Sequence, residues 1–312
     1  MDFVLIIIGL ILLVKCADWF VDGCSNVASS MGIPSLIIGL TIVAFGTSAP
    51  EAAVSVTASL KGMNDISLGN AVGSNICNLL LVLGVSGLFG SLTAKRKIIT
   101  RDFVYAIFSS IVLLILSFGF FVNGGTIGEI TRTNGLILLC FLGIYLYALL
   151  GDAFRSVREK EEKTKFNVKD VFLIIIGISG IIFGGQLVVN SATGIANMFN
   201  ISQNIIALTI IAVGTSLPEL VTSVVAAKKG KTDIAIGNVV GSNIFNIFFI
   251  LGMSSVVSPI TFGVDSFVDI IIMVIASILV YILLLVNKRI GRVKGVILLT
   301  FYIIYMMFVL AR

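Results

Sequence analysis

The chain has 312 residues, of which 58% are apolar and only 12% are charged. A soluble domain of this size carries about a quarter charged residues, so this chain cannot cover a water-facing surface and is expected to lie in a lipid bilayer. It contains no histidine, which excludes Ser–His and Cys–His nucleophile pairs and argues against transition-metal chemistry. The net charge of +5 does not by itself indicate nucleic-acid binding, and no nucleic-acid partner is expected.

Ten apolar segments are long enough to cross a membrane, and most of them are joined by short connections. They lie near residues 3–23, 34–59, 66–90, 103–123, 134–151, 171–192, 204–227, 234–257, 267–287 and 294–311. The first follows Asp2 without a basic leader or a small-residue cleavage site, so it is expected to be a retained span. The sequence thus predicts an all-α integral membrane protein with ten transmembrane helices.

Lys and Arg are distributed unevenly over the connections between these segments. With ten spans, alternate connections share a side of the membrane, and one such set holds 17 of the 21 basic residues. That set consists of residues 91–102, 152–170, 228–233 and 288–294. Basic residues mark the cytoplasmic side. The sequence therefore predicts a multi-pass protein of the cell membrane with both termini outside.

The two halves of the chain repeat one another. Residues 40–78 align with 208–246 without a gap at an offset of 168, and 26 of the 45 pairs from Leu40/Leu208 to Gly84/Gly252 are identical. Each copy holds five spans, an odd number, so the second copy must enter the membrane in the opposite orientation. We predict inverted five-helix repeats over 1–151 and 171–312, joined by a cytoplasmic linker at 152–170. Such repeats form binding sites near the midplane from interrupted helices.

The best-matched segments contain a glutamate inside an apolar span: "GTSAPE" ends at Glu51 and "GTSLPE" at Glu219. A buried carboxylate without a partner is costly, and neither glutamate has a basic residue in its own span. Lys15 is the one intramembrane basic residue, and Phe183 stands at its place in the second copy. A lysine could serve one glutamate, whereas a mobile cation could serve both.

The residues around each glutamate suit a hard cation. Pro50 lacks an N–H, so the backbone before it is expected to turn carbonyls toward a ligand. In "GNAVGSNICN" and "GNVVGSNIFN", a serine and an asparagine lie four residues apart on one helical face. Carboxylate, hydroxyl, amide and carbonyl oxygens favour sodium or calcium over zinc or copper. The glycines of these motifs are expected to permit close helix contact; they are Gly69, Gly73, Gly237 and Gly241.

The pattern GTS-x-PE followed by GN-x-x-GSN-x-x-N, present twice, resembles the alpha-repeats of the cation/calcium exchanger superfamily, and above all its prokaryotic sodium/calcium exchangers. The resemblance covers essentially the whole chain. It implies ten helices, of which the second, third, seventh and eighth carry the site while the first and sixth slide across it.

The resemblance also implies the roles of individual residues. Glu51 and Glu219 become the central calcium ligands, shared with sodium. Hydroxyls and carbonyls that serve sodium and calcium come from Thr47, Ser48, Thr215, Ser216, Ala44 and Ala212. Ser74 and Ser242 belong to flanking sodium sites, and Asn78 and Asn246 to the central position. Some members, including potassium-dependent exchangers, have an aspartate where this chain has Asn246, which puts potassium dependence in doubt. Asp18 and Asp22 are expected to serve helix packing or a cytoplasmic vestibule.

The leading hypothesis is a sodium/calcium antiporter that exports calcium, with both ions as transported cargo and no cofactor or obligate protein partner. The alternative is a proton/calcium exchanger that uses the same glutamates, because a buried carboxylate can itself take up a proton. An intramembrane enzyme with Ser48 or Ser216 as nucleophile lacks a histidine base, so the chain is not expected to be an enzyme. A passive cation channel is the remaining option.

Overall fold

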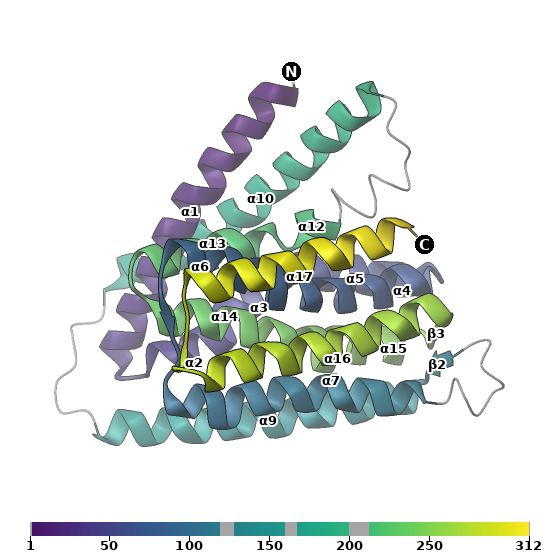
Figure 1. Ribbon diagram of the computed structural model, residues 1–312. Helices are drawn as coiled ribbons and strands as arrows, with labels where there is room; N and C mark the ends of the chain where they lie inside the picture. Colours follow the sequence, from purple (N-terminus) through teal and green to yellow (C-terminus); the bar gives the residue numbers. More distant parts are fainter. Residues whose placement is uncertain (1, 119–127, 160–166, 200–211, 312) are drawn as a thin grey trace.

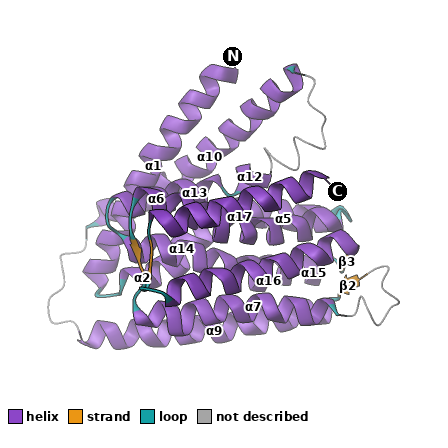
Figure 2. Ribbon diagram, in the orientation of Figure 1, coloured by secondary structure: helices purple, strands orange, loops and turns teal. Residues whose placement is uncertain are grey.

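The computed structural model describes residues 2–118, 128–159, 167–199 and 212–311, which are almost entirely helical (Figure 2). The elements of the first half are α1 (Asp2–Met31), α2 (Ser35–Ile38), η1 (Gly39–Val43), α3 (Ala44–Thr47), α4 (Ala49–Leu60), α5 (Asn64–Cys77), η2 (Asn78–Val82), α6 (Leu83–Phe89), β1 (Leu92–Thr93), η3 (Ile98–Asp102), α7 (Phe103–Ser117), β2 (Gly128–Ile130) and α9 (Arg132–Glu159). Those of the second half are α10 (Val168–Met198), α12 (Ala212–Thr215), α13 (Leu217–Lys228), α14 (Thr232–Phe245), η5 (Asn246–Leu251), α15 (Gly252–Val257), β3 (Ile260–Phe262), α16 (Val264–Leu285), β4 (Arg289–Ile290) and α17 (Arg292–Ala311).

Eight helices within the described residues are long and apolar enough to cross a membrane. A ninth span is obtained if Ser35–Thr47 and Ala49–Leu60, which meet at a bend of 49°, form one crossing. The remaining expected span, near 204–227, begins in residues 204–211, which lie outside the described residues. The expected linker at 152–170 includes the end of α9 and the start of α10, and its residues 160–166 are likewise not described.

The bend lies where the sequence places a proline after a serine. Ser48 leaves the helical region with φ −83° and ψ 6°, and α4 starts afresh with Pro50 in its first turn. The second half repeats this geometry, since Ser216 has φ −88° and ψ 5° and Pro218 follows in α13. Proline fits the first turn of a helix because its missing N–H would have no intrahelical partner there. Each proline therefore lies in the first turn of a new helix, and in the first half this new helix is bent by 49° from the one before it.

Helices α1 and α10 lie side by side and project beyond the rest of the bundle (Figure 1). Their backbones approach closely at glycines: a Cβ at Gly9 would lie 2.8 Å from Val188, and one at Gly177 would lie 2.9 Å from the Cys16 carbonyl. From Gly9 to Cys16 the residue number rises along α1, while the number of the partner on α10 falls from Val188 to Gly177. The two helices are therefore antiparallel. Small residues at such a contact let helices pack tightly in a membrane.

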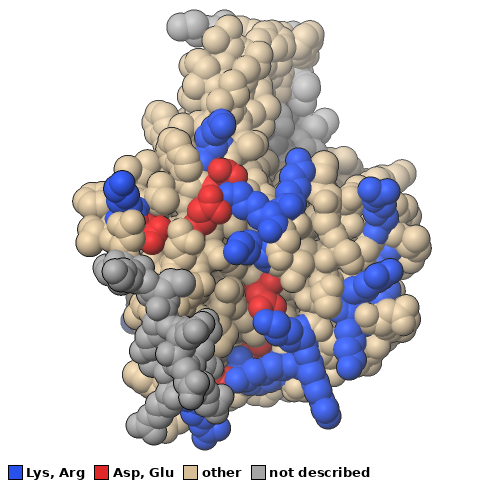
Figure 3. Space-filling model, turned by 90° about the vertical axis from the view of Figure 1, so that its left-hand side faces the viewer, with Lys and Arg blue, Asp and Glu red and all other residues tan. Residues whose placement is uncertain are grey.

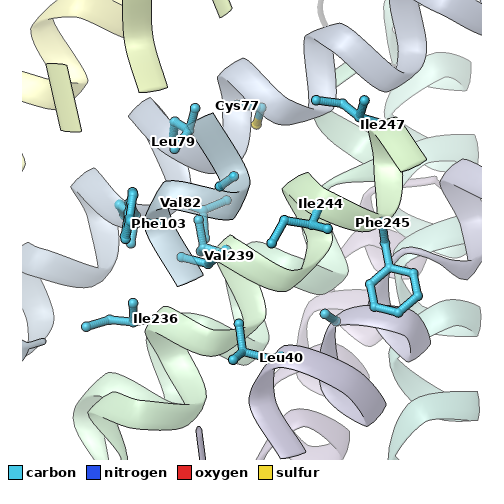
Figure 4. Close-up of a cluster of buried hydrophobic side chains, with 14 of the residues drawn as sticks. Leu40, Cys77, Leu79, Val82, Phe103, Ile236, Val239, Ile244, Phe245 and Ile247 are labelled. Carbon is cyan, nitrogen blue, oxygen red and sulfur yellow. The ribbon is translucent and has the colours of Figure 1, made fainter. Parts of the chain in front are cut away.

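Helix α14 continues through η5 and α15 as one span, Thr232–Val257, which lies at the centre of the bundle and whose most apolar stretch is 94% buried. Figure 4 shows Val239 and Ile244 of α14 close to Val82 of η2, with Leu40 of η1 also packed against α14. The predicted close contact at two glycines of α14 is confirmed: a Cβ at Gly237 would lie 3.0 Å from the Leu36 carbonyl, and one at Gly241 would lie 2.7 Å from the Leu40 carbonyl.

The matching glycines of α5 have no such neighbour among the described residues. A Cβ at Gly69 or Gly73 would meet nothing within 4 Å. By the offset of 168, the segment that corresponds to residues 36–44 is 204–212, most of which is not described. The predicted close contact at these two glycines therefore remains untested.

Two short antiparallel ladders join loops at opposite ends of the bundle (Figure 2). β1 pairs with β4 through Leu92↔Ile290, and β2 pairs with β3 through Ile130↔Ile260. The sequence did not predict these strands because each has only two or three residues, too few for a visible alternation. The β1–β4 ladder brings together two of the loops that hold most of the basic residues.

Candidate functional site

Glu51 and Glu219 occupy equivalent places in the structure. Each is the third residue of a helix that starts after a serine break, Glu51 in α4 and Glu219 in α13, and both side chains are fully buried. Helix N-termini carry partial positive charge and favour a nearby carboxylate. The proline-induced breaks thus give each carboxylate a favourable backbone environment deep inside the protein.

The two carboxylates are linked across the halves of the chain. Ser48 Oγ donates to Glu219 Oε1 at 2.8 Å, and Ser216 Oγ donates to Glu51 Oε1 at 3.4 Å. The other carboxylate oxygen, Oε2, is buried in both residues and has no hydrogen-bond partner within the described part of the chain. Each glutamate therefore keeps one oxygen available in the interior.

No described lysine or arginine forms an ion pair with either glutamate. Lys15, which the sequence places in the same membrane region, lies exposed on α1. Leaving two carboxylates buried without a counter-charge costs several kcal/mol per ion by order of magnitude. A bound cation or a bound proton would remove this cost, and the arrangement is therefore suited to binding one of them.

Hydroxyl groups from both halves surround the glutamates. Thr47 Oγ1 lies 3.0 Å from Asn238 Oδ1, 3.1 Å from the Val43 carbonyl and 3.3 Å from the Ala44 carbonyl. Ser242 Oγ lies 3.4 Å from the Ala44 carbonyl and 3.5 Å from Glu219 Oε1. The structure thus brings four of the predicted ligands, Thr47, Ala44, Ser242 and Glu219, to one place.

Three further predicted ligands, Ser74, Thr215 and Ala212, have different surroundings in the structure. Ser74 Oγ is buried without a hydrogen-bond partner in the described structure. Thr215 Oγ1 lies 3.4 Å from Asn70 Oδ1. Ala212 is the first described residue of α12, and the residues that precede it are not described.

Asn78 and Asn246 are the first residues of two π-helical segments, η2 and η5. Such segments widen a helix locally and occur frequently at functional sites. Asn246 Nδ2 donates to Asn75 Oδ1 at 3.0 Å, which leaves Asn246 Oδ1 without a partner among the described residues. Neither polar atom of the Asn78 amide has one. Buried polar atoms are almost always hydrogen-bonded in proteins, so these free oxygens are available to a ligand.

Sequence reasoning missed two asparagines that connect the halves. Asn70 Nδ2 donates to the Glu51 carbonyl at 3.2 Å, and Asn238 Nδ2 donates to the Glu219 carbonyl at 3.3 Å. Each amide also donates at 2.9 Å to a serine one turn further along, Ser55 or Ser223. Both asparagines belong to the repeated "GN" motif, so their identity in the two copies was the signal that could have identified them.

Asp18 and Asp22 lie away from these contacts. Their Oδ1 atoms lie 2.7 Å and 2.8 Å from Lys229 Nζ, and Lys229 also donates to the Asp18 carbonyl at 3.0 Å. Lys229 follows α13, so the ion pairs join α1 to the turn between α13 and α14. Both aspartates thus contact a neighbouring element, as a helix-packing role requires, through Lys229 of the basic run at 228–231.

Comparison with known proteins identifies the class that this fold and site define. The model of the sodium/calcium exchanger protein family matches residues 1–151 and 169–311, and the chain belongs to this family. The chain is 35% identical to the putative antiporter CaxA of Alkalimonas amylolytica over 97% of its own length and 96% of that protein. It is 31% identical to the sodium/calcium exchanger MaX1 of Methanosarcina acetivorans, over 98% of its length and 97% of that protein.

Solved structures of a related exchanger share the fold. One structure of the sodium-calcium exchanger NCX_Mj, soaked with 2.5 mM Na⁺ and 1 mM Sr²⁺, matches with a TM-score of 0.83 and 32% identity, covering 98% of this chain and 97% of that one. Another, soaked with 10 mM Na⁺ and no Ca²⁺, matches with a TM-score of 0.83 and 33% identity, covering 98% of both chains. The protein is therefore a multi-pass membrane protein of a class that carries out cation/calcium exchange.

Proposed function

We propose that the protein is a sodium/calcium antiporter that exports calcium in exchange for sodium. One alternating-access site near the membrane midplane, built around Glu51 and Glu219, binds both ions in turn. The observation that carries this proposal is that five predicted ligands have a buried oxygen without a hydrogen-bond partner in the described structure. They are Glu51, Glu219, Ser74, Asn78 and Asn246.

The chemistry of the set favours sodium and calcium. Carboxylate, hydroxyl, amide and carbonyl oxygens are the ligands that calcium and sodium take, and no sulfur or imidazole is needed. Two carboxylates carry a charge of about −2, which one calcium ion neutralises. Several sodium ions can neutralise it as well, but both loads cannot occupy one enclosed site. Mutual exclusion of the two ions is the physical basis of the exchange.

The proposed architecture is ten transmembrane helices in two inverted repeats. The repeats span 1–151 and 171–312, and the linker at 152–170 joins them. The paired contacts support it, because each hydrogen bond from Ser48 or Asn70 has a counterpart from the residue 168 positions later. The antiparallel pair of α1 and α10 also has the form expected of two helices that slide together across a site.

In this proposal both termini lie outside the cell. The basic side chains gather on the face at the left-hand end of Figure 1, which Figure 3 shows from the front. The β1–β4 ladder lies at this end, Arg289 belongs to it, and the basic residues 95–97 and Lys288 lie close to it in the chain. Since basic residues mark the cytoplasm, this end faces inward.

A proton/calcium exchanger remains the second candidate, since Glu51 and Glu219 are buried where a proton could replace a cation. Calcium-45 uptake into sodium-loaded proteoliposomes, measured at one pH on both sides, distinguishes the two. We expect uptake that requires internal sodium and does not require potassium. Uptake driven by a pH gradient without sodium would instead establish proton exchange.

A further inference from the structure

Asn238 and Asn70 use every hydrogen-bonding group of their side chains, and each bonds to both halves of the chain. Asn238 Nδ2 donates to the Glu219 carbonyl and to Ser223 Oγ, which belong to its own half. Its Oδ1 faces Thr47 Oγ1 of the other half at 3.0 Å. Asn70 makes the same three contacts with Glu51, Ser55 and Thr215.

These contacts give the Thr47 hydroxyl an acceptor in the other half of the chain. The Glu219 carbonyl can only accept a hydrogen bond, so the amide atom beside it must be the NH₂ group. The atom that faces Thr47 is then the carbonyl oxygen of Asn238, which can only accept. Asn238 Oδ1, at 3.0 Å, is the nearest of three oxygens that can accept the single proton of this hydroxyl, since the Val43 and Ala44 carbonyls lie at 3.1 Å and 3.3 Å.

A hydroxyl that binds a cation must turn its lone pairs toward the ion and its proton away from it. Asn238 accepts that proton, which leaves the lone pairs of Thr47 free. The same amide donates a hydrogen bond to the backbone carbonyl of Glu219. The carboxylate of Glu219 accepts a hydrogen bond from Ser48 of the first half. One side chain thus links the orientation of a hydroxyl from one half to the position of a carboxylate from the other.

We propose that Asn238 and Asn70 are positioning residues that orient the hydroxyls of Thr47 and Thr215 for cation binding. This inference rests on the proposed function, because it assumes that these hydroxyls bind transported ions. The effect is stronger at Asn238, which is fully buried and lies 3.0 Å from Thr47, than at Asn70, which is partly buried and lies 3.4 Å from Thr215.

A double-mutant cycle between Asn238 and Thr47 tests the inference. Asn238→Leu keeps the side-chain shape without hydrogen bonds, and Thr47→Val removes the hydroxyl. The readout is the apparent affinity of the purified protein for Na⁺ and for Ca²⁺, from ion-dependent thermal stabilisation. We expect each single variant to lose about tenfold in Na⁺ affinity, the size of one hydrogen bond to a charged centre, and the double variant to lose no more.

The design separates orientation from a merely structural role. If the two substitutions acted independently, their effects would multiply to a loss of about a hundredfold in the double variant, and this result would overturn the inference. Unchanged ion affinities in Asn238→Leu would also overturn it. In a Thr47→Ser background, which keeps a hydroxyl, Asn238→Leu should again cost about tenfold. Ser277→Ala is the matched control: its buried hydroxyl donates to the Met273 carbonyl, and both affinities should stay at wild-type values.

Two further outcomes have a defined meaning. If Asn238→Leu does not fold, the cycle of Asn70→Leu with Thr215→Val takes its place, with a smaller loss expected and the same additivity criterion. If the wild-type protein shows no stabilisation by either ion, the proposed function fails. If the wild type is stabilised and the asparagine variants respond equally well, only the positioning role fails.

Discussion

Ser48 and Glu219 lie 171 positions apart in the chain, yet the Ser48 hydroxyl donates a 2.8 Å hydrogen bond to the Glu219 carboxylate in the protein interior. Ser216 and Glu51 form the reciprocal contact at 3.4 Å. Each half of the chain thus supplies a hydroxyl to the carboxylate of the other half. A change in the relative position of the halves must alter both contacts, which couples the site to any movement between them.

Replacing either carboxylate by its neutral amide is expected to abolish calcium transport. In Glu51→Gln or Glu219→Gln, one remaining carboxylate leaves a doubly charged ion half compensated in a low-dielectric site, at a cost of several kcal/mol. Calcium-45 uptake into proteoliposomes measures the loss, and size-exclusion chromatography verifies the folding. Glu129→Gln, at an exposed position on β2, is the matched control and should transport normally. Near-normal exchange in either site variant would refute the proposed site.

Labelling of single cysteines tests the topology. Cys140 is exposed and is replaced by serine first, while the other three native cysteines are buried. A cysteine at Arg96 should react with a membrane-impermeant maleimide only from the cytoplasmic side, and one at Glu129 only from outside. Both positions are exposed, so access does not limit the reaction. If both react from the same side, the ten-span arrangement and the inverted repeat are wrong.

The ion pairs of Lys229 predict a dependence of stability on pH. Partial burial lowers the pKa of Lys229, but hydrogen bonds and ion pairs with Asp18 and Asp22 outweigh this effect and raise the pKa above its usual 10.5. A raised pKa means that the stabilisation is complete below 10.5 and disappears as the pH rises through the folded-state value.

Lys229→Met should therefore lower stability at neutral pH by about 0.2–1 kcal/mol. The difference in melting temperature from wild type should be constant between about pH 7 and 9 and shrink at more alkaline pH. Lys231→Met, at an exposed position of the same turn, is the control and should show neither effect. A difference that grows with pH would show that Lys229 acts by another interaction.

The uncharged amide of Asn246 sets the charge of the proposed site and therefore the net charge that each transport cycle moves across the membrane. With Asn78 and Asn246 uncharged, the site has a charge of about −2 and is neutral with one calcium bound. If three sodium ions replace the calcium, the loaded site carries about +1, and moving that charge across 100 mV is worth about 2.3 kcal/mol. Exchange should then respond to a valinomycin-clamped potential and need no potassium in the medium. Exchange that ignores the potential would refute this charge assignment while leaving the glutamate site intact.

Asn246→Asp adds a carboxylate to the same position. The new group must either stay protonated or recruit a further cation, because a third buried negative charge has no partner. We expect calcium exchange in this variant to become dependent on pH or on an additional monovalent cation. Measuring uptake over a range of pH with and without potassium distinguishes the two responses, and behaviour identical to wild type would show that position 246 lies outside the site.

The sequence predicts the site better than it predicts the connections between helices. Glu51 and Glu219 were found because a carboxylate in an apolar span is conspicuous and the repeat shows it twice. Asn70 and Asn238 were not singled out, since an asparagine beside a glycine looks like helix packing until its partners in another helix are known. The ion pairs of Lys229 depend on how α1 crosses the α13–α14 turn, and a tertiary contact of that kind leaves no local pattern.

Competition between the two ions at equilibrium tests the central claim most directly. Calcium-45 binding to the purified protein is measured with increasing sodium, in wild type and in the two glutamate variants. The account predicts one saturable calcium site per chain that sodium empties completely, and no high-affinity calcium binding in Glu51→Gln or Glu219→Gln. Calcium that remains bound at saturating sodium, or that binds both glutamate variants as tightly as wild type, would contradict a single shared site.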